Sequence, residues 1–260
     1  MRQMVAHFAP LHQVRAVRDS APAPAHRTEA VEIFGGDGPV VLTCEHATER
    51  LPAPWRWPEA DQRLVGTHWA YDLGAADLTY DLQRRLSCAA VLSRFSRLLV
   101  DPNRPEGAET LFRDVADGEP VRFNLDLDAE ERERRLAGYY RPYHAAADEV
   151  VEASSAPIVF SVHTFTPVYE GTKRWMEIGV LYDTHEAISL ELGRALRDAG
   201  FHVAYNEPWS GKEGLIYSVD RHARSHGREP IEIEVRQDLA VQAEFRWRLV
   251  DAIAGWLRER

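Results

Sequence analysis

The chain has 260 residues, of which 45% are hydrophobic and 28% charged, and its formal net charge is −10 at pH 7. This size favours one large α/β domain over two small ones. An acidic surface repels phosphate backbones, and we find no basic stripe that compensates, which excludes a nucleic-acid partner. The arginines of segment 131–135 alternate with acids and are interpreted as a solvated helix face. Two cysteines give no disulfide framework.

The N-terminal region differs from the rest of the chain. Residues 20–26 alternate alanine and proline like a linker. We therefore expect residues 1–30 to be a peripheral N-terminal extension and residues 31–260 to form a single domain. No apolar run has the length of a membrane span, and no signal-peptide core is found, so we expect a cytoplasmic protein with no membrane partner.

The first half of the chain combines β-branched runs with one helical period. Strands are predicted at 31–34, 39–43, 88–92 and 98–100, with a helix at 72–86. A long polar loop follows at 102–121, and loops of this length usually carry function.

In the second half, Asp128 is the predicted N-cap of a helix that continues towards Val151. Pro142 either divides this helix or lies in the first turn of a second one. Further elements are predicted as strands at 158–162, 178–182, 203–205 and 231–235, and as helices at 187–199 and 238–257. The interleaving of strands and helices predicts a three-layer α/β/α sandwich around a mixed sheet.

Two of the predicted strands lead into a histidine. The run 39–43 is followed by His46, with Glu49 three residues later, and the run 157–162 is followed by His163. Open α/β sheets bind ligands at the carboxyl ends of their strands. Two histidines and one carboxylate with an open fourth position are typical of catalytic zinc. The alternative is that these are loop histidines without a metal.

Other residues near these strands have competing interpretations. Asp72 is either a plain helix N-cap or a third or alternative metal ligand. Cys44 is interpreted as a small buried residue at a strand end and not as a ligand or nucleophile. His222 and His226 have the i, i+4 spacing of a helical metal site, but the arginines around them favour exposed positions. No Gly-x-Ser-x-Gly elbow exists, which argues against a serine hydrolase.

Three further features suggest an anion site and a base. Arg104 lies between the prolines of segment 101–105 and is suited to a bidentate grip on a carboxylate, or to an ion pair with a nearby acid. Lys212 lies in a glycine-flanked turn that is able to close on an anionic substrate, although most such turns do not. Glu232 and Glu234 share one face of a predicted strand. They are either exposed acids on an edge strand, or Glu234 accepts a proton from metal-bound water.

Five segments in the same order resemble the N-formylglutamate amidohydrolase family. They are "VVLTCEHATERLP", "THWAYDLGAADL", "LLVDPNRP", "VFSVHTFTP" and "IEIEVRQDL". The resemblance covers roughly residues 38 to 240. It implies the fold of the zinc carboxypeptidases and aspartoacylases, with residues 31–260 as one catalytic domain.

The resemblance implies a zinc site in this chain. His46 and His163 would be ligands, and Glu49 would complete a His-x-x-Glu pair like that of the carboxypeptidases. An aspartate at the position of Asp72 is usual in the family, whereas Glu49 departs from it. The carboxylate ligand is therefore left between Glu49 and Asp72.

The remaining implied roles concern substrate and proton transfer. Asn103 and Arg104 resemble the Asn-Arg pair with which carboxypeptidases hold a terminal carboxylate, and Glu234 lies where those enzymes have their general base. In addition to these implied roles, we expect Arg94 or Arg97, on the segment before the Asp101 loop, to help zinc to stabilise the tetrahedral oxyanion.

The implied activity is zinc-dependent hydrolysis of the amide bond of a small anionic N-acyl amino acid such as N-formylglutamate. Two alternatives stay open: another zinc amidase or peptidase of the carboxypeptidase–aspartoacylase type, and an inactive relative that binds a metal or small molecule. Manganese or iron also fits two histidines and a carboxylate.

Overall fold

The structure is a computed structural model that describes residues 24–260. Most of the predicted N-terminal extension, residues 1–23, lies outside the described residues. Strand β1 (His26–Arg27) pairs antiparallel with β2 (Val31–Asp37), so this end of the predicted extension is part of the sheet.

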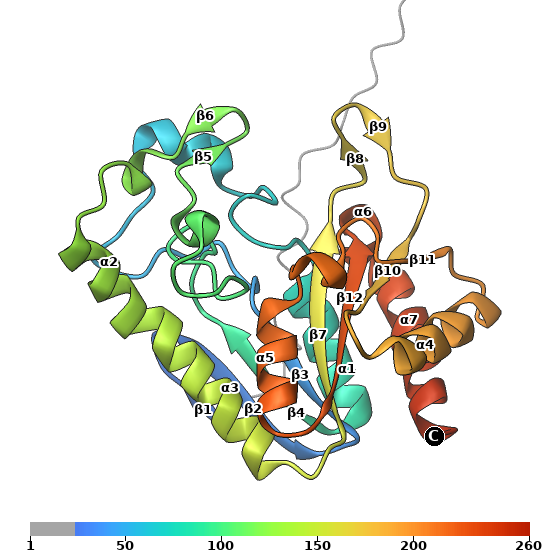
Figure 1. Ribbon diagram of the computed structural model, residues 1–260. Coiled ribbons are helices and arrows are strands. Elements are labelled where there is room, and N and C mark those ends of the chain that lie inside the picture. The colour runs from blue at the N-terminus through green and yellow to red at the C-terminus, as the bar shows by residue number, and fades with distance from the viewer. Residues whose placement is uncertain (1–23) are drawn as a thin grey trace, which may run out of the picture.

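The centre of the fold is an eight-stranded mixed sheet in the order β1-β2-β4-β3-β7-β12-β10-β11 (Figure 1). Its other strands are β3 (Val40–Cys44), β4 (Cys88–Ser93), β7 (Ile158–Phe165), β10 (Ile178–Leu181), β11 (Val203–Tyr205) and β12 (Glu229–Arg236). Strands β4, β3, β7 and β12 run parallel, so their carboxyl ends meet at one edge of the sheet. Strands β2 and β10 run antiparallel to their neighbours β4 and β12.

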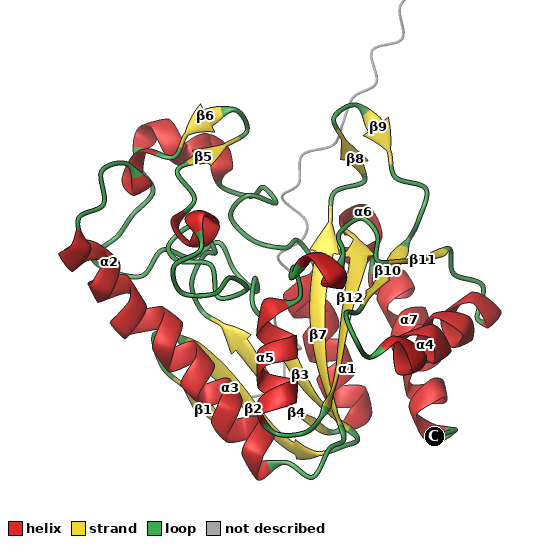
Figure 2. Ribbon diagram, in the orientation of Figure 1, coloured by secondary structure: helices red, strands yellow, loops and turns green. Residues whose placement is uncertain are grey.

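Helices cover both faces of the sheet (Figure 2). Helices α1 (Ala75–Leu86) and α4 (Glu186–Asp198) pack on one face, and α7 (Ala243–Arg258) packs against both. Helices α3 (Arg141–Ala153) and α5 (Tyr217–Ser225) pack on the other face. The predicted α/β/α sandwich around a mixed sheet is therefore confirmed. No helix among residues 24–260 is both long and apolar enough to cross a membrane.

Shorter elements complete the described part of the chain. Two hairpins stand above the carboxyl ends of the parallel strands, β5 (Val115–Ala116) with β6 (Glu119–Pro120), and β8 (Val168–Tyr169) with β9 (Thr172–Lys173) (Figure 1). The short helices are α2 (Ala129–Arg135) and α6 (Gln237–Ala240). The 3₁₀ turns are η2 (Glu59–Leu64), η3 (Glu109–Phe112), η4 (Arg122–Asn124) and η6 (Gly211–Glu213).

Strand β12 contributes side chains both to the hydrophobic core and to the edge of the sheet where the parallel strands end. Ile231, Ile233 and Val235 join the core that α1, α4 and α7 cover. Glu232 and Glu234 alternate with them and point to the opposite face. Because β12 lies between β7 and β10, both acids are buried, at 1% and 6% exposed. The alternative of exposed acids on an edge strand is therefore wrong.

Proline shapes the helix that Asp128 begins. The Asp128 carboxylate caps α2 by accepting from the Glu131 amide at 2.8 Å. A π-helical turn, η5 (Leu136–Tyr140), separates α2 from α3, and Pro142 lies in the first turn of α3. Proline has no N–H to donate to the carbonyl four residues earlier, and the widened turn accommodates this loss.

Three local predictions are wrong. Residues 98–100 form a turn, although they are buried as an apolar run would suggest. The closing helix is divided into α6 and α7 by residues 241–242. Segment 131–135 is not wholly solvated, because Arg135 is 1% exposed. Its guanidinium donates to the Leu99 carbonyl at 3.1 Å and to Asn124 Oδ1 at 2.6 Å, which ties the long loop to α2.

Candidate active site

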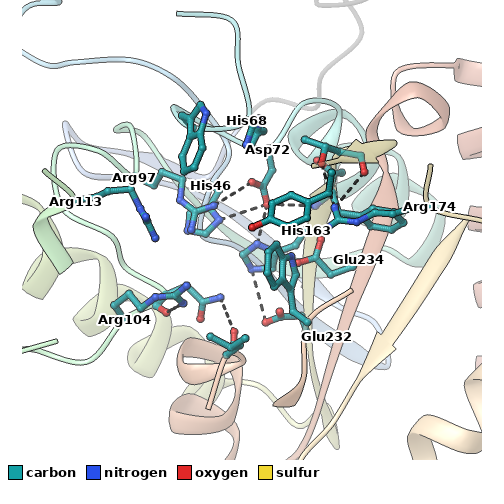
Figure 3. A pocket seen from close by; sticks show the side chains of 18 residues that line it. His46, His68, Asp72, Arg97, Arg104, Arg113, His163, Arg174, Glu232 and Glu234 are labelled. Atoms are coloured by element: carbon teal, nitrogen blue, oxygen red, sulfur yellow. Dashed lines mark hydrogen bonds and ion pairs between the residues drawn. The ribbon is translucent and has the colours of Figure 1, made fainter. Parts of the chain in front are cut away.

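His46, Asp72 and His163 meet at the carboxyl-end edge of the sheet (Figure 3). His46 follows β3, His163 lies near the end of β7, and Asp72 belongs to the loop before α1. Asp72 Oδ2 lies 2.9 Å from His163 Nδ1 and 3.4 Å from His46 Nδ1. The three side chains are at most 4% exposed, so this cluster is buried at the base of a cavity.

The position of Asp72 is set by its backbone and by the start of α1. Its amide donates to the His46 carbonyl at 2.9 Å, and its Oδ2 accepts from the Thr164 amide at 3.2 Å. Gly74 follows with φ +83°, and a Cβ there would lie 2.7 Å from the backbone of Ala240. Only glycine fits this left-handed, closely packed position. The N-cap position of α1 is Gly74, so the Asp72 side chain is not the helix cap.

A second layer of carboxylates orients the two histidines. Asp101 Oδ1 lies 2.7 Å from His46 Nε2, and Glu45 Oε2 lies 3.0 Å from His163 Nε2. Histidines that bind metals usually donate their other ring N–H to such a carboxylate, which fixes the tautomer. Here Asp101 and Glu45 occupy both Nε2 atoms. The Nδ1 atoms of His46 and His163 are therefore left to face Asp72.

Glu45 is itself held rigidly. It accepts hydrogen bonds from Tyr143 Oη at 2.9 Å and from Ser161 Oγ at 2.7 Å, in addition to His163. Burial alone would raise the pKa of Glu45, but the hydrogen bonds and the charge of His163 hold that pKa well below its usual range. The carboxylate therefore stays ionised and keeps its acceptor role.

The donor set fits a divalent metal ion. The candidate ligand atoms of His46, Asp72 and His163 all lie within 4.8 Å of one another, and imidazole and carboxylate are zinc ligands. Glu49 is not part of this group. Its carboxylate accepts from the Gly66 amide instead. Of the two carboxylates left open by the sequence, the structure brings Asp72 to the histidines.

Glu232 and Glu234 line the same cavity from β12. Glu234 is paired in register with His163 across the β7–β12 ladder. Neither Oε2 atom accepts a hydrogen bond from a described residue, and Glu232 Oε2 lies 3.7 Å from His163 Nε2. Burial is the main cause that raises the pKa of Glu232 to about 7 and the pKa of Glu234 well above its usual range. Such shifts are common at catalytic positions.

Four arginines line this cavity of about 310 Å³. Arg97, Arg104 and Arg113 lie on one side of the cluster and Arg174 on the other (Figure 3). Arg97 is paired with Asp101 at 2.9 Å and lies 3.5 Å from Asp72. Arg104, Arg113 and Arg174 form no ion pair with a residue that the structure describes. Three guanidinium groups without an ionic partner in a partly enclosed cavity favour an anionic ligand.

The loop that carries Arg104 is anchored to α5. Asn103 Oδ1 accepts from the Ser218 amide at 3.0 Å, and Asn103 Nδ2 lies 3.3 Å from the Leu215 carbonyl. Tyr140 Oη donates to the Arg104 carbonyl at 2.7 Å. Asn103 lines the cavity, but its amide group is already engaged with the backbone, so it positions the loop.

Three residues that the sequence singled out do not line the cavity. Lys212 is exposed over the ring of Tyr182 and does not line the cavity, so its closure on a substrate stays a prediction. Arg94 donates to the Thr28 carbonyl away from the cluster. His222 is 0% exposed, so its predicted exposure is wrong. Cys44 is buried as predicted.

Four residues of the site were missed by sequence reasoning: Glu45, Asp101, Arg113 and Arg174. Glu45 directly precedes His46 and Asp101 lies in the segment of Arg104, and the usual pairing of a metal-bound histidine with a carboxylate is the signal that points to both. Arg113 and Arg174 have no sequence signal, because loops far apart in the chain bring them to the cavity.

The chain is similar to known proteins in sequence and in fold. The family model "N-formylglutamate amidohydrolase" matches residues 38–241. A gene product of Agrobacterium tumefaciens has a similar structure, with a TM-score of 0.83 and 27% identity over 89% of this chain and 94% of its own. The N-formylglutamate amidohydrolase from Ralstonia eutropha JMP134 shares the fold, with a TM-score of 0.70 and 22% identity over 89% of this chain and 99% of that one.

A curated relative also matches part of the chain. The "N-formylglutamate deformylase" of Pseudomonas putida is 30% identical over 118 residues, which are 41% of this chain and 42% of the relative. The chain therefore spans less than half the length of that relative in this match. The family model extends over most of the described residues, from the turn before β3 to the residue after α6, and on this ground the chain belongs to the N-formylglutamate amidohydrolase family.

Proposed function

We propose that this protein hydrolyses the amide bond of a small anionic N-acyl amino acid, such as N-formylglutamate, with a bound zinc ion. The observation that carries the proposal is the His46–Asp72–His163 cluster, buried in a cavity beside Glu234 and three arginines without an ion pair. A metal site, a base and an anion site in one cavity are the three parts that amide hydrolysis of such a substrate requires.

His46, Asp72 and His163 would hold the metal. When bound, zinc lowers the pKa of a coordinated water towards neutrality and polarises a carbonyl oxygen. Asp101 and Glu45 keep the two histidines in the tautomer that binds metal.

Glu234 is the proposed general base. It lies beside His163 in the sheet register, and burial raises its pKa well above the usual range, which makes it a stronger base than an exposed glutamate. It accepts the proton of the attacking water and delivers it to the leaving amine. Glu232 raises the pKa of Glu234 further through its nearby negative charge.

The arginines bind and orient the substrate. Arg104 and Arg113 hold its carboxylate, which fixes the scissile amide relative to the cluster. Arg97 lies next to Asp72 and takes the oxyanion role that the sequence left between Arg94 and Arg97. Lys212 is not included in this proposal.

The test is hydrolysis of N-formylglutamate by the zinc-loaded protein, compared with Glu234→Gln. We expect the variant to keep its metal and to lose about 10²- to 10⁴-fold in kcat, because only proton transfer is removed. Glu229→Gln is a matched control on the same strand, where Glu229 faces Arg260 at 3.4 Å and not the cavity. It should retain full activity.

Either of two results would contradict the proposal. An active Glu234→Gln enzyme would remove Glu234 from the base role. A zinc-, manganese- or iron-loaded protein that cleaves no member of a panel of N-acyl amino acids would contradict the amidohydrolase function itself.

A further inference from the structure

The chain that follows His163 forms the side of the cavity away from Arg104. Strand β7 ends at Phe165, and the β8–β9 hairpin begins three residues later, so the hairpin stands above the carboxyl end of β7 (Figure 1). Arg174 follows β9 and enters the cavity from this side, opposite Arg97, Arg104 and Arg113 (Figure 3).

Three aromatic rings surround Arg174. Its guanidinium carbon lies 5.4 Å from the ring centre of Phe165, 4.9 Å from that of Tyr169 and 5.4 Å from that of Trp209. Its Nη1 also donates to the carbonyl and hydroxyl oxygens of Thr166, both at 3.1 Å. We call Phe165, Tyr169, Arg174 and Trp209 the aromatic wall. The cation holds these rings in place and lines the cavity with them.

The aromatic wall leaves much of its apolar surface uncovered. Tyr169 is 46% and Trp209 39% exposed, although both line the cavity, and their rings lie 6.2 Å apart in an edge-to-face arrangement. Exposed aromatic residues gathered at one place commonly mark a binding surface. A planar apolar group that covers these rings would gain both burial and ring contacts.

A formyl group is too small to use this surface. Its carbonyl carbon carries only a hydrogen, so the acyl side of an N-formyl amino acid offers no apolar surface to cover the rings of Tyr169 and Trp209. The cavity, at about 310 Å³, lies at the small end of the range for ligand pockets. This volume suits one amino acid with one ring better than a long peptide.

We propose that the aromatic wall is a subsite for a planar aromatic acyl group, so that the enzyme prefers N-aroyl amino acids to N-formyl ones. This inference rests on the proposed function and adds the class of acyl group. Water supplies the oxygen that bonds to the carbonyl carbon as the C–N bond breaks. The products are an aromatic carboxylate and the free amino acid, whose nitrogen takes up the protons released.

The test compares kcat/KM for N-benzoylglutamate and N-formylglutamate in the zinc-loaded enzyme. In the wild type we expect the benzoyl substrate to be favoured. Trp209→Ala and Tyr169→Ala should each lower the benzoyl-to-formyl ratio by about 10- to 100-fold, the range expected when a pocket loses apolar contacts. Trp175→Ala is the control, since Trp175 is 60% exposed near the same hairpin and does not line the cavity. It should leave the ratio unchanged.

The outcomes separate the inference from the function on which it rests. If N-formylglutamate is cleaved but the ratio favours formyl, or does not fall in either wall variant, the aromatic subsite is refuted and the amidohydrolase function stands. If wild type cleaves neither of these two substrates, the inference is refuted, and the panel of N-acyl amino acids decides whether the proposed function fails as well. Melting curves of each variant establish that a lower ratio does not come from unfolding.

Discussion

Two clusters in this protein each combine histidines with one aspartate, yet they are built differently. The cavity cluster is His46, Asp72 and His163. The second cluster lies between α3 and α5, where His144 Nδ1 is 2.9 Å from His222 Nε2 and His222 Nδ1 is 2.7 Å from Asp148 Oδ1.

The difference lies in where the ring nitrogens point. In the cavity cluster, Asp101 and Glu45 occupy the Nε2 atoms from outside, so the Nδ1 atoms of His46 and His163 converge on one aspartate. In the second cluster the histidines bond to each other and to the aspartate in a chain, which occupies both ring nitrogens of His222 and the Nδ1 of His144. Only His144 Nε2 is left without a partner among the described residues, so no pair of free ring nitrogens faces the aspartate. Outer carboxylates, more than the residue types, therefore distinguish a candidate metal site from a structural hydrogen-bond network.

Removal of one histidine from each cluster is the strongest test of this difference. His163→Ala, like His46→Ala, should lower bound zinc from about one ion per chain to almost none and abolish hydrolysis, with a loss of about 10³-fold or more. His222→Ala should keep its zinc, although the loss of a buried hydrogen-bonded ring lowers its thermal stability. Elemental analysis of the purified proteins measures the metal directly. Equal metal loss in His163→Ala and His222→Ala would show that the two clusters do not differ in metal binding.

Substitution of the outer carboxylates, Glu45 and Asp101, should have a smaller effect on zinc binding. Glu45→Gln and Asp101→Asn are expected to weaken zinc binding by about 10- to 100-fold, because the histidines lose the acceptor that fixes their tautomer. Asp148→Asn makes the same chemical change in the second cluster and should leave zinc affinity as in wild type. Competition with a chromophoric chelator measures the dissociation constants. Unchanged affinity in both Glu45→Gln and Asp101→Asn would refute the orienting role.

The histidines of the second cluster should make the stability of the protein depend on pH. Burial, with the charges of His222 and Arg221, lowers the pKa of His144 to about 2, and burial also lowers the pKa of His222. Unfolded histidine has a pKa near 6.5. Well above pH 6.5, neither the folded nor the unfolded chain binds a proton on His144 or His222. Below it the unfolded chain binds protons that the folded chain does not, so the free energy of unfolding falls by up to about 1.4 kcal/mol per pH unit for each histidine.

Urea unfolding of wild type and His144→Gln between pH 5 and 7.5 tests this sign. A glutamine side chain does not titrate, so the stability of the variant should fall less steeply between pH 6.5 and pH 5 than that of wild type. Histidines outside this cluster are common to both proteins and cancel in the difference, so the difference reports on His144 and its bonded neighbour His222. Parallel curves would mean that His144 is protonated equally in the folded and unfolded chains.

Much of the architecture was predictable because it depends on local patterns. The strand at 203–205 coincides with β11, and the Asp128 cap was visible as an acid before a helical period. His46 and His163 were found for a similar reason, since each follows an apolar strand run whose end marks the ligand-binding edge of a parallel sheet.

Other features depended on contacts between distant segments. The 98–100 run resembled a strand, but it is buried by packing of the long loop and has no strand partner among the described residues. Arg135 and His222 resembled exposed polar residues, yet each finds buried partners on another segment, Asn124 in one case and His144 in the other. Local polarity says nothing about such partners.

The sequence by itself determined the fold class, the histidines at two strand ends and the pair of acids on one face of β12, because these follow from residue spacing along a single element. Only the tertiary structure decided that Asp72 and not Glu49 meets the histidines, that Lys212 stays outside the cavity, and that four arginines and an aromatic wall surround it. These choices depend on strand order and on how loops pack, since both bring together side chains that lie tens of residues apart.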